Sequence, residues 1–318
     1  MKMKTADAAA WLAERDGFLL ITHRRPDGDT ICSAAALARG LRAVGKTAFL
    51  FPNPEITERY ADRVKELLAP DGYEYGFIVS VDTASEGQLP PGAAELAKDV
   101  GLCVDHHMSN TGYAENTCCY PEKSSCGEVV YEILLRLCGK IEAEIASLLY
   151  IAVSTDTGCF AYANTTAETH RCAALLIEAG ADCAALNKEF FRTKARKRVE
   201  LEGMVLAALE YWFGGRVCVA KITRAMLART GASENDMEDI ASLPGQMEGA
   251  LAGVTLKELP DGTIKVSVRT VQGTDANALC TRFGGGGHYM ASGCTIAGSM
   301  DEVSGLLKKA IGEIWDLA

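Results

Sequence analysis

Three short apolar segments, each followed at once by aspartate or histidine, limit what this chain can fold into more than any other feature. They span residues 18–22, 77–81 and 100–104. Short, unbroken apolar runs are typical of parallel strands that are buried on both faces. Because helical patterns lie between these segments, the sequence predicts an α/β fold in which helices cover a parallel sheet.

The helix after the third strand has clear boundary signals. Ser125 and Glu128 form the pattern of a capping box, and Gly139 is a typical helix end. The apolar spacing of residues 145–152 predicts a further helix. Asp156 is therefore expected to follow a helix rather than a strand.

The length of 318 residues predicts two domains, since one domain usually takes roughly 100–200 residues. A polar pattern over 182–213 predicts one long helix, and the strands beyond it, with Asp261-Gly262 as a hairpin turn, predict a second core. We expect a parallel-sheet domain over 1–185, a helical linker over 186–214 and a smaller mixed α/β domain over 215–318.

The net charge of the protein limits the kinds of ligand and partner that it is expected to bind. A net charge of −10 argues against a broad basic surface for long duplex nucleic acid and leaves a short anionic ligand as an alternative. The basic stretch 188–198 is predicted to be a solvated helix face rather than a patch that guides substrate. No apolar run reaches the ~18 residues of a membrane span, and the N-terminal residues lack the apolar core of a signal peptide. We expect a cytoplasmic protein without a membrane partner.

The chain's twelve cysteines contain no CxxC pair. Most lie in apolar stretches, which favours buried thiols over a zinc site.

Four polar clusters carry the candidate chemistry: residues 22–30, 81–83, 104–107 and 154–158. The first three follow predicted strands, where ligands bind in parallel sheets. The first cluster alone is equally well interpreted as an acidic surface turn around Gly28, and a single aspartate at a strand end is often a helix cap. Together, however, so many carboxylates cannot stay ionised without cations. Oxygen ligands with some imidazole suit Mn²⁺, with Mg²⁺ and Co²⁺ as alternatives.

These clusters resemble the four motifs of the DHH phosphoesterase superfamily, and a glycine-rich segment over 282–288 resembles the signature of the DHH-associated C-terminal domain. The resemblance spans nearly the whole chain in the same order. One departure is Cys32, where relatives usually carry glycine. The matching positions of the four motifs are His23, Asp27, Asp29, Asp82, Asp105, His106, His107 and Asp156.

The resemblance implies the role of each residue. His23, Asp27 and Asp82 would bind one Mn²⁺, and Asp82 would bridge to a second ion. His107 would face the substrate phosphate and protonate or stabilise the leaving group. Asp105 would hold an imidazole in the required tautomer. A water activated by both ions would attack phosphorus in line. The ligands of the second ion would be Asp29, Asp82, His106 and Asp156.

The second domain is expected to bind substrate. Four consecutive glycines are often a flexible linker, but here structured sequence flanks them, which favours a backbone N–H cradle for phosphate. Arg269 lies on the polar face of its predicted strand, where it either contacts a nucleotide phosphate or points into solvent. The candidate substrate-binding residues are Arg269, Gly284, Gly285, Gly286, Gly287 and His288.

The resemblance implies a Mn²⁺-dependent hydrolase of very short oligoribonucleotides, of 3′-phosphoadenosine 5′-phosphate, or of both, as in the nanoRNase group of the superfamily. A cyclic di-AMP or linear di-adenylate phosphodiesterase is the alternative, and a homodimer is compatible with the sequence. Two other classes of protein share single features with this sequence. In a haloacid dehalogenase-like phosphatase Asp27 would be a nucleophile, but residues 23–26 separate it from the strand. A tRNA-associated binding module would not need the ligands of the first domain.

Overall fold

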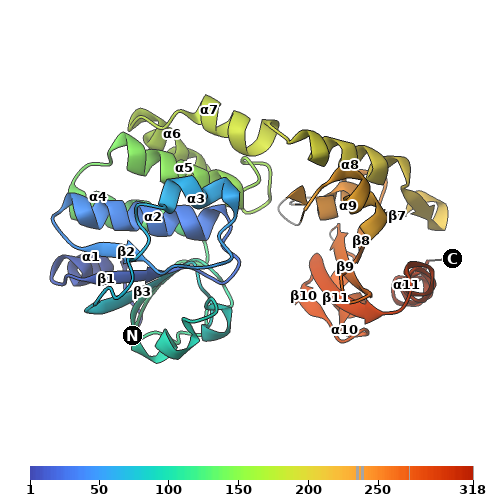
Figure 1. The fold of residues 1–318 in the computed structure, drawn as a ribbon, viewed down its shortest axis with the longest axis horizontal. Helices are drawn as coiled ribbons and strands as arrows, with labels where there is room; N and C mark the ends of the chain where they lie inside the picture. The colour runs from blue at the N-terminus through green and yellow to red at the C-terminus, as the bar shows by residue number, and fades with distance from the viewer. Residues whose placement is uncertain (234–235, 238–239, 272, 318) are drawn as a thin grey trace. The chain divides into compact units, whose positions relative to one another are not determined.

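The computed structural model describes residues 1–233, 236–237, 240–271 and 273–317. The chain forms two compact units, residues 1–193 and 194–318, each with its own hydrophobic core (Figure 1). Among the described residues, no helix is both long enough and apolar enough to span a membrane.

The first unit is built on a five-stranded sheet in the order β2-β1-β3-β4-β5. All four strand pairs are parallel, which confirms the predicted α/β fold with a parallel sheet. The three predicted strands are β1, β3 and β4, and every residue of β1 and β4 is buried. The edge strand β2 was missed because it has only three residues, and β5 because its sequence, Asn-Thr-Cys-Cys, is not an apolar run. The bounds are β1 Phe18–Ile21, β2 Ala48–Leu50, β3 Phe77–Val81, β4 Val100–Asp105 and β5 Asn116–Cys119.

Helices pack on one face of this sheet, and two short 3₁₀ helices, η1 and η2, pack on the other (Figure 1). The main core lies under α1, α2, α4 and α5. The bounds are α1 Thr5–Ala13, α2 Gly28–Ala43, α3 Glu58–Val64, η1 Glu86–Gln88, η2 Ala94–Asp99, α4 Cys126–Cys138, α5 Ala143–Asp156, α6 Ala167–Glu178 and α7 Cys183–Asn187.

The capping signals of α4 are confirmed in part. Ser125 Oγ accepts the backbone N–H of Glu128, and Gly139 ends the helix with a φ of 74°. The Glu128 carboxylate, however, does not close the capping box. It accepts hydrogen bonds from Ser124 and Thr169 instead, which ties α4 to α6.

The prediction of one long helix over 182–213 is wrong. Helix α7 runs into a π-helical turn, η3 Lys188–Arg192, and the chain is extended at Thr193 before α8 begins. The helical spacing is present on both sides of this break, so periodicity alone did not reveal it. The basic stretch there forms ion pairs, including Lys194 and Arg198 with Glu202. The Arg198 side chain is 11% exposed, so this part of the stretch is not the solvated face that was predicted.

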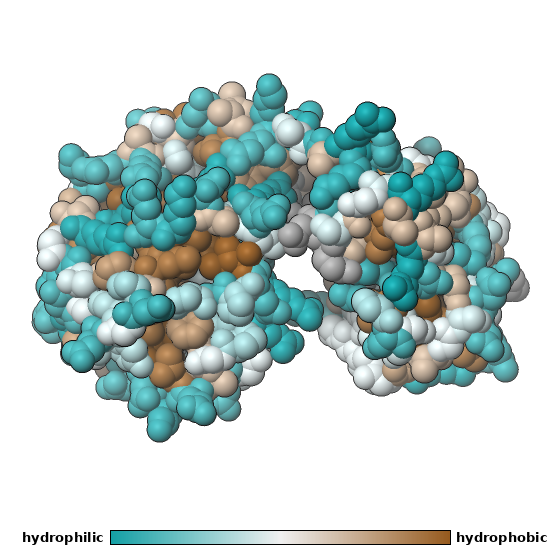
Figure 2. All heavy atoms as spheres, in the orientation of Figure 1, coloured by the Kyte–Doolittle hydropathy of each residue, from teal (hydrophilic) through white to brown (hydrophobic). Residues whose placement is uncertain are grey.

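The second unit contains a six-stranded mixed sheet in the order β10-β11-β9-β8-β7-β6, in which only the β7–β8 pair is parallel. The predicted Asp261-Gly262 turn connects β8 to β9, with Gly262 at a φ of 82°. On the face shown in Figure 2, hydrophilic residues cover most of both units. The bounds are α8 Arg196–Ala207, β6 Glu210–Trp212, η4 Phe213–Gly215, β7 Val217–Ile222, α9 Arg224–Thr230, η6 Ile240–Gln246, β8 Ala252–Glu258, β9 Thr263–Thr270, α10 Ala276–Thr281, β10 Gly286–His288, β11 Ala291–Ala297 and α11 Met300–Ile314.

Candidate metal centre

The predicted ligands meet at the carboxyl ends of three neighbouring strands. The loop after β1 carries His23, the residue directly after β3 is Asp82, and β4 ends at Asp105. Because β1, β3 and β4 are adjacent and parallel, these positions share one edge of the sheet. Asp156 joins them as the last residue of α5, as the sequence predicted.

Two groups of donor atoms surround Asp82. His23 Nε2 lies 3.7 Å from Asp27 Oδ1 and 3.8 Å from Asp82 Oδ2. His106 Nε2 lies 3.5 Å from Asp82 Oδ1. It also lies 3.7 Å from Asp29 Oδ2 and 3.6 Å from Asp156 Oδ2. Among the described residues, three sets of donor atoms are each close enough together to hold one ion: His23, Asp27 and Asp82; Asp29, His106 and Asp156; and Asp82, His106 and His107.

Asp82 lies among these candidate ligands, and a cation beside it would offset the cost of its burial. Its side chain is 3% exposed, and its Oδ1 is buried without a hydrogen-bond partner. A buried carboxylate oxygen without a donor is costly. The backbone of Asp82 is in the left-handed region, with a φ of 57°, a strained conformation that is found most often at functional sites. The chemistry of these carboxylates and imidazoles therefore fits bound divalent cations.

The carboxylates repel one another. Burial raises the pKa of Asp82 and of Asp29 well above the usual range, and neighbouring carboxylates add to both shifts. Burial also raises the pKa of Asp156 to about 7, helped by the charge of Asp27. The pKa of Asp27 itself is lowered, because the nearby His23 imidazole and the two backbone N–H groups that it accepts outweigh its burial. Bound cations would offset this repulsion.

Two helix N-termini hold the acidic residues in place. Asp27 is the N-cap of α2, and its Oδ1 accepts the backbone N–H groups of Asp29 and Thr30 at 3.1 Å each. Asp29 accepts the first two N–H groups of α4, from Cys126 at 2.7 Å and Gly127 at 2.9 Å. Both contacts favour the ionised carboxylates, as expected at helix N-termini.

Gly28 has a different role from the predicted one. It is the first residue of α2 rather than a tight turn, and its φ is not positive. A Cβ atom at this position would lie 2.3 Å from Thr155 Oγ1. The glycine therefore permits the start of α2 to pack against the end of α5, which brings Asp27 and Asp29 close to Asp156.

The two adjacent histidines are oriented differently. His106 Nδ1 lies 3.2 Å from the carbonyl oxygen of Lys123, which leaves Nε2 for the carboxylates. His107 Nδ1 lies 2.7 Å from Asp105 Oδ1, so Asp105 orients His107. This hydrogen bond is the main reason that the pKa of His107 is raised, whereas burial lowers the pKa of His106.

The sequence did not reveal three residues that support the site through tertiary contacts. Asn110 donates to Asp105 Oδ2 at 2.6 Å, and Asn53 donates to the His23 carbonyl at 2.9 Å. Asn164 donates to the carbonyl oxygens of Asp156 and Ser124. Nothing in their spacing distinguishes them from loop asparagines.

The predicted substrate-binding residues lie in the second unit. The glycine run is not a linker, because Gly286 and Gly287 pair with β11 in a hairpin that also includes His288. A Cβ at Gly285 would lie 2.2 Å from the carbonyl oxygen of Gly293, so β11 approaches too closely for a side chain there. Arg269 is exposed and pairs with Ala291 across the sheet.

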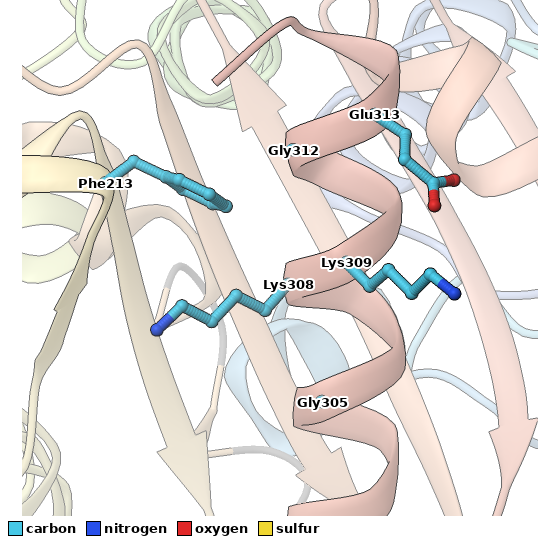
Figure 3. A pocket seen from close by; sticks show the side chains of 6 residues that line it. All are labelled: Phe213, Gly305, Lys308, Lys309, Gly312 and Glu313. Atoms are coloured by element: carbon cyan, nitrogen blue, oxygen red, sulfur yellow. The ribbon is translucent and has the colours of Figure 1, made fainter. Parts of the chain in front are cut away.

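A hollow of about 560 Å³ elsewhere in the second unit is lined by none of the predicted substrate-binding residues (Figure 3). It lies between Phe213 and the Gly312 turn of α11, with Lys308 and Lys309 beside it.

All twelve cysteines are free and eight are buried. Among the described residues, no group of candidate metal ligands includes a cysteine.

The comparisons with known proteins match both units. Residues 18–153 match the family model described as "DHH family, N-terminal domain", and residues 214–316 match the one described as "DHHA1 domain". A crystal structure of an exopolyphosphatase-related protein from Bacteroides fragilis has a TM-score of 0.88, with 25% identity over 97% of this chain and 96% of that one.

Three curated relatives are also similar. The chain is 31% identical to the "Bifunctional oligoribonuclease and PAP phosphatase NrnA" of Thermus thermophilus, over 92% of this chain and 89% of that protein. It is 28% identical to the protein of the same name from Bacillus subtilis, over 92% and 93%. The "Cyclic-di-AMP phosphodiesterase GdpP" of Geobacillus thermodenitrificans is 22% identical over 96% of this chain, which spans 48% of that protein.

Proposed function

Because the chain belongs to the DHH family and carries a DHHA1 domain, we propose that it hydrolyses very short oligoribonucleotides, 3′-phosphoadenosine 5′-phosphate, or both, with two divalent cations, Mn²⁺ being our first choice. The relatives that match over nearly their whole length are named for these two activities. That supports the substrate class, while the cations are argued from the residues themselves.

One observation carries the proposal: Asp82 Oδ1 is buried without a hydrogen-bond donor and lies 3.5 Å from His106 Nε2. In this position the carboxylate is suited to bridge two ions. His23 and Asp27 would complete one ion's ligands. Asp29, His106 and Asp156 would complete those of the other. When bound, such ions supply a nucleophile from water at neutral pH and share the charge that develops on the phosphoryl oxygens.

Two histidines would provide a metal ligand and a proton donor for the reaction. His106 is held through Nδ1, so its Nε2 is directed at the carboxylates. His107 is protonated more easily than an ordinary histidine, because Asp105 accepts its Nδ1 hydrogen bond. It is therefore our candidate for donating a proton to the leaving oxygen.

We assign substrate binding in the second unit to its glycine-rich hairpin. Gly284, Gly285, Gly286 and Gly287 would lie against a phosphate, with His288 at the end of the strand. The N–H groups of Gly284 and Gly285 already donate to the carbonyl oxygens of Thr281 and Cys280, so a phosphate would have to use other donors of the hairpin. Arg269 lies on the strand next to this hairpin and can form charge-assisted contacts with a second phosphate.

The test is a chromatographic assay of the full chain with Mn²⁺ on di- to hexanucleotides, 3′-phosphoadenosine 5′-phosphate and cyclic di-AMP. We expect hydrolysis of the short oligonucleotides or the bisphosphate, and its loss in a chelator. Cleavage of cyclic or linear di-adenylate alone would favour the alternative function, which the relative named as a cyclic-di-AMP phosphodiesterase supports. No hydrolysis of any phosphate ester would overturn the proposal.

A further inference from the structure

A cavity of about 610 Å³ lies within the first unit and has His107 in its wall. This volume is within the range of small-molecule binding sites. Three segments that are distant in the sequence surround it: residues 1–4, the loop 107–112 that follows the two histidines, and residues 117–122.

Hydrogen bonds fix the walls of this cavity. Residues 1–4 extend the sheet beyond β5, because Met3 donates to the Thr117 carbonyl at 2.8 Å and Thr117 donates to the Met1 carbonyl at 2.7 Å. The Thr5 N–H donates to Tyr120 Oη. On the opposite side, the Thr111 N–H donates to the Ala84 carbonyl at 2.8 Å. The cavity is therefore formed before any ligand binds.

The lining combines apolar and cationic groups. Met3, Met108 and Pro121 provide an adaptable apolar surface, and the Met108 side chain is 88% exposed. Lys2 and Lys4 also line the cavity, and neither forms an ion pair with any described residue. The carboxylate in the lining is Glu122. Such a lining suits a ligand with a flat apolar part and a negative group.

The cavity is coupled to the metal centre through two side chains. His107 and Asn110 both line it, and both form hydrogen bonds with Asp105, at 2.7 Å and 2.6 Å. A ligand here would lie beside the imidazole that we assign to proton donation.

We propose that this cavity binds one nucleotide of the substrate, with its base against Met3 and Met108 and its phosphate near Lys2 and Lys4. The inference rests on the proposed function for the identity of the ligand. It places one nucleotide residue of a short RNA in the same unit as the metal centre, beside His107.

Methionine methyl groups give a local test. The Mg²⁺-loaded full chain, labelled with ¹³C at its methionine methyls, is titrated with AMP and its NMR signals are followed. The signals of Met3 and Met108, assigned with Met3→Leu and Met108→Leu variants, should shift and saturate. The signal of Met290, which lies in the turn between β10 and β11, reports binding in the second unit separately.

Charge-reversal variants test whether Lys2 and Lys4 contact the ligand. In Lys2→Glu/Lys4→Glu, the Kd reported by Met108 should rise by about tenfold or more, as expected for the loss of charge-assisted contacts. The matched control is Lys98→Glu/Lys140→Glu, which reverses two exposed lysines outside the cavity and should leave this Kd unchanged.

Three results would overturn the inference: shifts at Met290 alone, equal Kd values for the protein and its Lys2/Lys4 variant, or the same Met108 shift with inorganic phosphate as with AMP. Adenosine should shift Met108 only at higher concentration. The outcome is independent of catalysis, because a chain that hydrolyses nothing can still shift Met108, and an active enzyme can leave it unshifted.

Discussion

Asp82 adopts a backbone conformation that is unusual for aspartate, at the position where two groups of ligands meet. The sequence made this residue a candidate ligand, because an aspartate directly after a buried strand lies at the ligand-binding edge of a parallel sheet. The positive φ and the unpaired Oδ1 were not predictable, since both depend on what the fold places around the side chain.

The metal-free protein should become less stable as the pH rises from about 4 to about 7. The pKa of Asp156 is raised from 3.8 to about 7 by burial and by Asp27, and those of Asp29 and Asp82 are also raised. A carboxyl group with a raised pKa binds more protons in the folded than in the unfolded state, so stability falls through this window.

Urea unfolding at pH 5 and pH 7.5, with chelator or with Mn²⁺, measures this effect. Added cation should raise the midpoint more at pH 7.5 than at pH 5. Asp156→Asn should reduce the difference. An equal gain at both pH values would contradict the account.

The contact between Asp105 and His107 predicts a shift in the pH–rate profile. Asp105→Asn removes the main cause of the raised His107 pKa. The alkaline limb of kcat should therefore move to lower pH, with the largest loss of turnover on that limb. His107→Gln should abolish that limb. A profile unchanged by Asp105→Asn would show that His107 does not donate the proton.

At the level of secondary-structure elements, the sequence predicted β1, β3 and β4 well because a buried strand is a continuous apolar run. It missed β2, whose three residues give too short a pattern, and β5, whose sequence Asn-Thr-Cys-Cys is not a continuous apolar run. It also missed the break at Thr193, because spacing does not report a single extended residue between helical turns.

The packing of α2 against α5 can be tested at Gly28. A Cβ there would lie 2.3 Å from Thr155 Oγ1, so Gly28→Ala should destabilise the protein by about 1–3 kcal/mol, as overpacking does. Adding Thr155→Ala should restore part of the loss, since all three nearest atoms belong to that side chain. A double-mutant cycle by urea unfolding measures the coupling. Strictly additive losses would show that the two residues do not clash.

At the scale of the whole molecule, we assign different tasks to the two units. The acidic and imidazole ligands all lie in residues 1–193, whereas the glycine-rich hairpin and Arg269 lie in residues 194–318. The order of motifs along the chain is the basis of this assignment, which stays a prediction.

The division predicts that variants of the second unit depend on the substrate. Arg269→Ala and His288→Ala should each lower kcat/KM for a dinucleotide by roughly ten- to a hundredfold, the value of a lost charge-assisted contact. A small activated phosphodiester should be hydrolysed almost as before. Equal losses on both substrates would place these residues in the catalytic machinery instead.

The central claim is that Asp82 is shared by two cations. Metal content per chain, measured by mass spectrometry on gel-filtered protein together with kcat, tests it most directly. We expect two Mn²⁺ per chain in the protein and at most one in Asp82→Ala, with a loss in turnover of at least ~10³-fold, or about 4 kcal/mol of barrier. An Asp82→Ala variant that holds two Mn²⁺ and turns over normally would contradict the account.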